Sequence, residues 1–284
     1  MRKLREKRHA DTVERTAFVL HSTVGYQLHG WIHRCETAGT TPNLPRPAIV
    51  LCPGIDDGAD SFVGTSNPVS ADEIARLGFV VARFDPAGRG KSWGNEDFGG
   101  QEHQDNVATI VKTLAARPDV DQQRIGLLAI SLGIGMAVGA AALPSIGVAW
   151  ILDWEGPCDR EIITAGGTMM VPAAGHRLDD NAYWHPREAV RTVGQLRCAD
   201  VRIQAKQDHA QPGETRHAMR MIRAADSGDL PWFQLNNHAR GEIPKNPQWI
   251  PNGRLSANQA ILKKLKQLRH ESLQTDATAT QCSV

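Results

Sequence analysis

Residues 125–152, IGLLAISLGIGMAVGAAALPSIGVAWIL, decide the fold, because no side chain in this stretch carries a formal charge. Its length alone would suffice to cross a bilayer. Pro144 and five glycines interrupt it, however, and such residues disfavour one continuous helix. Parallel strands that are covered on both faces read as unbroken apolar runs. We therefore predict a buried strand ending at Ile130, a helix after Ser131 and a second buried strand, with no membrane span.

The same alternation of strand and helix extends in both directions along the chain. Further strands are predicted at residues 48–52, 79–85, 148–152, 201–206 and 231–236, and an antiparallel hairpin at 15–34. Helices are predicted between the capping-box residue Ser70 and Gly78, and at 101–117, 213–225 and 256–270. This order predicts an α/β fold with a mostly parallel central sheet and helices on both faces.

The domain organisation follows from where this alternation stops. Residues 1–14 form a basic N-terminal segment, and 15–270 are expected to fold as one domain, since chains of this size commonly share one core. Residues 157–198 fit the alternation least and are either a small cap-like insertion or an irregular connection. Residues 271–284 lack apolar periodicity and are expected to form a flexible tail.

Composition excludes several classes of protein. The 284 residues are 41% hydrophobic and 22% charged, which is typical of globular proteins and not of disordered ones. The 32 Lys and Arg nearly balance the 31 Asp and Glu. A nucleic-acid binder needs a basic excess or patch, so no nucleic-acid partner is expected.

The cysteines argue against disulfides and against a metal site. They are odd in number and widely scattered, with no C-x-x-C pair, at Cys35, Cys52, Cys158, Cys198 and Cys282. The basic N-terminus is not followed by the apolar stretch of a signal peptide. We therefore expect free thiols in a reducing, cytoplasmic compartment, and neither a metal nor an organic cofactor.

Ser131 directly follows a predicted strand. In open α/β sheets, ligands bind beyond the carboxyl ends of the strands, so this is an expected position for a catalytic residue. The turn that exposes a nucleophilic serine between strand and helix needs small residues two positions before and two after it, because the backbone approaches closely there. Ala129 and Gly133 meet this requirement, with alanine in place of the more usual first glycine. A serine that merely caps a buried helix is the alternative.

Two further residues complete a candidate catalytic triad with Ser131. A serine hydroxyl needs an imidazole to accept its proton and a carboxylate to orient that imidazole. Asp208 and His238 follow the last two predicted strands and supply these groups in the expected chain order. The competing acid is Asp153. The competing base is His209, which we place second because neighbouring residues of an extended chain point in opposite directions.

Backbone N–H donors for an oxyanion hole, and a substrate pocket, are expected near Ser131. The Pro53-Gly54 turn can direct the Ile55 N–H toward the Leu132 N–H, and two such donors would form an oxyanion hole. Acidic residues at the mouth could recognise a cationic group, although such residues also cap turns. Apolar residues of the 157–198 segment could line an acyl pocket or form the core of a cap. The candidate substrate-binding residues are Asp56, Asp57, Glu155, Met169 and Trp184.

Over residues 15–270 the sequence resembles the α/β-hydrolase superfamily, and within it the dienelactone-hydrolase-like and single-domain serine esterase or peptidase branches. The landmarks that carry the resemblance are Pro53-Gly54, the Asp85–Ser92 segment, the Ala129–Gly133 turn, Asp208 and His238.

The resemblance implies a serine hydrolase that acts through an acyl-enzyme. Ser131 would be the nucleophile, His238 the base and Asp208 the orienting acid. The expected substrate is a small carboxylic ester. A peptidase, amidase or acyltransferase is the alternative of the same fold, and a binding protein that retains the fold without activity is the alternative of another class. The sequence does not indicate the oligomeric state.

Overall fold

A computed structural model describes residues 12–36, 44–55, 57–64, 66–165, 176–210 and 215–273. The strands form one eight-stranded sheet in the order β1-β2-β4-β3-β5-β6-β7-β8. β1 and β2 form an antiparallel hairpin, β2 runs antiparallel to β4, and the remaining neighbours are parallel. The strands are β1 (Val13–His21), β2 (Gln27–Cys35), β3 (Arg46–Cys52), β4 (Val80–Phe84), β5 (Val120–Ile130), β6 (Trp150–Trp154), β7 (Ala199–Ile203) and β8 (Phe233–Leu235).

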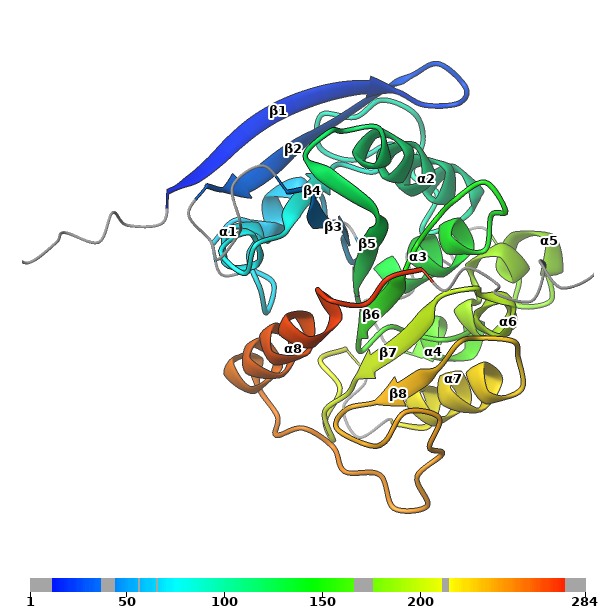
Figure 1. Ribbon diagram of the computed structural model, residues 1–284. Coiled ribbons are helices and arrows are strands. Elements are labelled where there is room, and N and C mark those ends of the chain that lie inside the picture. Colours follow the sequence, from blue (N-terminus) through cyan, green and yellow to red (C-terminus); the bar gives the residue numbers. More distant parts are fainter. Residues whose placement is uncertain are drawn as a thin grey trace, which may run out of the picture.

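Helices cover both faces of this sheet (Figure 1). One apolar cluster joins the sheet to α2 (Gln101–Ala115), α3 (Gly133–Ala141) and α7 (Arg216–Asp226). A second cluster on the opposite face includes side chains of α1 (Ala71–Ala75) and α8 (Arg254–Leu268). The prediction of a mostly parallel sheet between two helical layers is confirmed.

The uncharged run 125–152 folds as a strand, a helix and a strand. β5 and β6 are neighbours in the middle of the sheet, with Ile130 paired to Trp154, and α3 lies between them in sequence. Nearly every side chain of α3 is buried, which explains why this helix has no polar face. In the described part of the chain, no helix combines the length and apolar character that crossing a bilayer requires.

Other local predictions also hold at residue level. The Ser70 side chain accepts a hydrogen bond from the Glu73 N–H, and the Glu73 carboxylate accepts one from the Ser70 N–H, which completes the capping box of α1. Gly78 follows this helix with a φ of 96°, a left-handed value that glycine adopts most easily.

Short helices occur in the described parts of the segment between β6 and β7, residues 155–165 and 176–198. They are α4 (Arg160–Ala165), α5 (Asn181–Trp184), α6 (Ala189–Thr192) and the 3-10 turns η3 (His185–Arg187) and η4 (Val193–Gln195). A further 3-10 turn, η1 (Ala59–Phe62), follows β3.

The sheet contains an uncompensated buried acid at Asp200 on β7. Its side chain is almost completely buried, and neither carboxylate oxygen has a hydrogen-bond partner in the described residues. Burial, reinforced by the negative charge of Asp153 and opposed by Arg202, raises the pKa of Asp200 to about 7. The folded state therefore favours the protonated acid.

This raised pKa predicts a pH-dependent loss of stability. The stability that Asp200 contributes is complete below its ordinary pKa of 3.8 and is lost as the pH rises through about 7. Relative to wild type, Asp200→Asn should therefore gain roughly 3 kcal/mol of unfolding free energy between about pH 5 and about pH 9, since one pKa unit corresponds to ~1.4 kcal/mol. Urea unfolding at both pH values measures the gain. The exposed Asp226→Asn is the control, and an equal gain in both variants would contradict the prediction.

Candidate active site

Ser131 lies on a sharp turn between β5 and α3. Its φ is 52°, a left-handed value that is uncommon outside glycine, and its N–H donates to the Trp154 carbonyl at the end of β6. Gly133 permits this turn, because a Cβ there would lie 2.3 Å from the Cys52 carbonyl oxygen. The turn thus has the close backbone approach that the spacing of small residues predicts.

The two predicted oxyanion donors are the N–H group of Leu132, directly after Ser131, and that of Ile55, which follows Gly54, where a Cβ would lie 3.4 Å from Ser131 Cβ. The N–H groups of Ile55 and Leu132 donate no hydrogen bond to any described residue. The Ile55 and Leu132 side chains belong to the same apolar cluster as Trp184. Neither N–H group is therefore committed to a described partner, as the predicted role of oxyanion donor requires.

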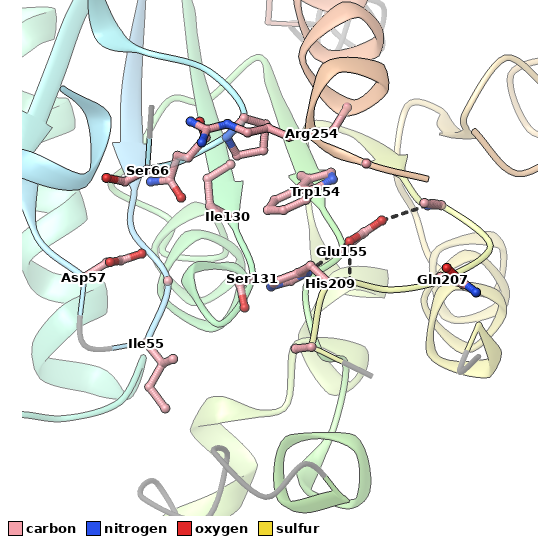
Figure 2. A pocket seen from close by; sticks show the side chains of 17 residues that line it. Ile55, Asp57, Ser66, Ile130, Ser131, Trp154, Glu155, Gln207, His209 and Arg254 are labelled. Carbon is pink, nitrogen blue, oxygen red and sulfur yellow. Dashed lines mark hydrogen bonds and ion pairs between the residues drawn. The ribbon is translucent and has the colours of Figure 1, made fainter. Parts of the chain in front are cut away.

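Ser131 lines a cavity of about 530 Å³ at the carboxyl ends of the strands (Figure 2). The walls come from the turn after β3, the ends of β5, β6 and β7, the loop before α1 and the first turn of α8. Among the lining residues are Ile55, Asp57, Asn67, Ile130, Ser131, Trp154, Glu155, His209 and Arg254.

The histidine in this cavity is His209, and a glutamate orients it. His209 Nδ1 lies 3.0 Å from the Glu155 carboxylate, and the His209 backbone N–H donates to the same oxygen at 2.9 Å. The ring stacks on Trp154 with the ring centroids 4.5 Å apart. These contacts direct Nδ1 to the carboxylate and leave Nε2 without a hydrogen bond to any described residue.

Glu155 owes its position to the register of β5 and β6. Ile130 pairs with Trp154, so that Ser131 and Glu155 follow at the same level of the sheet. Glu155 has a φ of 52° and is buried, with only 2% of its surface exposed. Its second oxygen accepts the Ala205 N–H at 2.9 Å. The carboxylate is therefore held in place by donors from the loop that follows β7.

Asp208, the predicted acid, lies next to this pair and has other principal partners. Its carboxylate accepts hydrogen bonds from the Gln204 side chain at 3.0 Å and the Ala210 N–H at 2.9 Å, and lies 3.1 Å from His217 Nε2. Burial by itself raises the pKa of Asp208, but the close contact with the His217 imidazole and the hydrogen bond from Gln204 outweigh it and hold the pKa below its usual range. His209 Nδ1 is 3.5 Å from Asp208.

His238, the predicted base, is not brought together with Asp208 or with the cavity. Its Nε2 accepts the Gln248 N–H at 2.9 Å, and its Nδ1 lies 3.7 Å from Glu242. It is absent from the described residues that line the cavity. The reason is that β8 ends at Leu235 and the chain turns at once, with the His238 N–H bonded to the Leu235 carbonyl.

The remaining predicted residues divide into three groups. Asp57 lines the cavity as expected. Trp184 does not, because it is buried beside Leu132 and Ile163 and its Nε1 donates to the Arg177 carbonyl. Asp153, the alternative acid, is fully buried in an ion pair with Arg202. Asp56 and Met169 lie outside the described residues.

Glu155, Asp208 and His209 are also close enough to offer three ligands to a metal ion. Their ligand atoms lie within 4.8 Å of one another. Both oxygens of Glu155 and both of Asp208 already have N–H or imidazole partners, however. These hydrogen bonds explain why the three residues lie together: they form a network that orients His209.

His209, the second choice of base from the sequence, and Glu155, a predicted substrate-binding residue, both line the cavity with Ser131. An extended chain at Asp208–His209 would direct the two side chains apart, but the Ala210 N–H bonds back to the Asp208 side chain in a tight turn. Glu155 could have been found from the sequence, because it follows a predicted strand next to the one that ends at Ser131.

Comparisons with known proteins support the fold. No protein-family model and no curated protein matches the sequence, but many solved structures match the structure. An esterase from Pyrococcus furiosus aligns at a TM-score of 0.63 and 13% identity, over 90% of this chain and 91% of its own.

Two peptidases align as well. A puromycin-hydrolyzing peptidase from Mycobacterium tuberculosis has a TM-score of 0.65 at 14% identity, over 91% of this chain and 40% of its own. Dipeptidyl peptidase 4 from Porphyromonas gingivalis has a TM-score of 0.63 at 15% identity, over 90% of this chain and 35% of its own. The chain thus spans nearly the whole esterase but less than half of either peptidase. Together with the strand order and the turn at Ser131, these alignments show that the chain has the α/β-hydrolase fold.

Proposed function

We propose that this protein is a serine hydrolase that cleaves carboxylic esters, with Ser131 as nucleophile, His209 as base and Glu155 as orienting acid. The observation that carries the proposal is the 3.0 Å contact between His209 Nδ1 and Glu155 in the cavity that Ser131 lines. A carboxylate on Nδ1 holds the proton there and leaves Nε2 as the basic nitrogen.

In the proposed reaction, His209 Nε2 takes the Ser131 proton as Oγ attacks the ester carbonyl. The Ile55 and Leu132 N–H groups stabilise the oxyanion. Collapse of this intermediate breaks the bond to the alcohol, which leaves with the proton from His209. Water then attacks the acyl-serine with His209 again as base, releasing the acid and restoring Ser131.

The proposal requires Ser131 Oγ and His209 Nε2 to come within hydrogen-bond distance when substrate binds. No hydrogen bond joins Ser131 Oγ to His209 Nε2 in the described residues. Catalytic hydrogen bonds in unliganded enzymes are often long and shorten when substrate binds. An amide substrate would use the same groups. The ester is preferred because an aligned protein of similar length is an esterase.

The proposal predicts that a fluorophosphonate probe labels Ser131. The probe reacts with an activated serine and not with an ordinary one, so peptide mapping should find the adduct on Ser131 in wild type. Ser131→Ala should fold normally and lose the label, and its hydrolysis of short-chain 4-nitrophenyl esters should fall by several orders of magnitude. Folded wild-type protein that takes no label would contradict the proposal and favour the non-catalytic binding protein.

A further inference from the structure

Among the described residues that line the cavity is an arginine, Arg254, whose charge no described acid balances. Arg254 is the first residue of α8, and its side chain extends toward the loop at Ser66, across the cavity from Ile55 (Figure 2). Its guanidinium donates to the Asn67 carbonyl and forms no ion pair with a described residue. A guanidinium has five N–H donors, so one carbonyl leaves most of its capacity unused.

Arg254 is not the only side chain of α8 that contacts this loop. The side chain of Asn258, one turn further along α8, donates to the Pro68 carbonyl at 2.7 Å and to Glu73 at 3.2 Å. α8 and the loop are therefore joined without Arg254. The fully buried Arg202 is paired with Asp153, whereas the exposed Arg254 has no acid partner among the described residues.

The other charges of the cavity do not neutralise Arg254. Both oxygens of Glu155 are engaged by Ala205 and His209. Asp57 lies at the other side, beside the turn after β3, where its Oδ2 would be 3.4 Å from a Cβ on Gly54. The Asp57 carboxylate therefore lies near the predicted oxyanion donors, and the Arg254 guanidinium lies at the other side of the cavity, at α8.

We infer that Arg254 binds an anionic group, a carboxylate, on the substrate, so that the preferred substrates are esters that carry a free carboxylate. This inference rests on the proposed function. Arginine pairs with carboxylates through two parallel hydrogen bonds, which suits a cavity that must fix the orientation of a small ester. Apolar contact with Ile130 and Trp154 can hold the chain between the carboxylate and the ester.

The test compares matched esters. Mono-4-nitrophenyl adipate and 4-nitrophenyl hexanoate differ only in a terminal carboxylate on the acyl side, and 4-carboxyphenyl hexanoate and phenyl hexanoate differ in the same way on the alcohol side. Wild type should prefer the anionic member of one pair. Arg254→Gln should reduce that preference in kcat/KM by about 10- to 100-fold, the range for a hydrogen bond to a charged group. Arg269→Gln, at the far end of α8, should leave the preference unchanged.

A binding measurement separates this inference from the proposed function. Adipamic acid cannot be hydrolysed as an ester, and it should raise the melting temperature of wild type more than hexanamide does, with the difference lost in Arg254→Gln. Hydrolysis of neutral esters without any preference for the anionic ones would overturn the inference and leave the proposed function intact. Binding of adipamic acid through Arg254 without ester hydrolysis would support the inference and contradict the proposed function.

Discussion

His209→Asn should lower kcat/KM for short-chain esters by at least about a thousand-fold, whereas His238→Asn should change it by less than about ten-fold. His209 lines the cavity with Ser131 and is oriented by Glu155. His238 instead accepts a hydrogen bond from Gln248 and lies near Glu242. Asparagine keeps a polar side chain at each position but cannot accept and return the serine proton.

The two histidine variants act as controls for each other. Each histidine lies in a loop that follows one of the last two strands of the sheet. Either substitution can therefore alter the stability of its loop as well as the rate of the reaction. Circular dichroism and melting temperature should show that both variants fold. Fluorophosphonate labelling of Ser131 should be lost in His209→Asn and kept in His238→Asn. The reverse result would restore the triad of Ser131, Asp208 and His238 and would mean that the loop after β8 rearranges when substrate binds.

Glu155→Gln should reduce kcat by about a thousand- to ten-thousand-fold, which is the effect of replacing the orienting carboxylate of a serine triad by its amide. An amide at this position can donate to Nδ1 and so favours the wrong tautomer of His209. KM should change much less, because Glu155 is buried and its oxygens bind Ala205 and His209. Steady-state kinetics on one neutral ester separates the two parameters.

Asp208→Asn is the matched comparison for Glu155→Gln. Asp208 is 3.5 Å from His209 Nδ1 and has closer partners in Gln204 and His217. Because its pKa is held below the usual range, the carboxylate is charged in the folded protein, and its amide should lower stability. We expect a smaller loss of kcat, within about ten-fold, together with a lower melting temperature. A larger kcat loss in Asp208→Asn than in Glu155→Gln would assign the orienting role to Asp208.

The architecture and the sharp turn that carries Ser131 could be predicted from the sequence. The uncharged run 125–152, the capping box at Ser70 and the small residues around Ser131 depend on local patterns that retain their meaning in any tertiary context. Gly133 illustrates this: its lack of a side chain is visible in the sequence, and the structure adds only the atom that a Cβ would meet.

The side chains that line the cavity with Ser131 lie partly on loops whose course no local pattern determines. The sequence by itself determined the mostly parallel sheet and the turn at Ser131, because hydrophobic periodicity and residue size act over a few neighbouring positions. Only the tertiary structure decided between His209 and His238 as the histidine of the cavity, and it placed Glu155 against His209. The physical reason is that these choices depend on hydrogen bonds between distant segments: His209 and Glu155 are 54 residues apart, and the loop after β8 is held by its own backbone contacts.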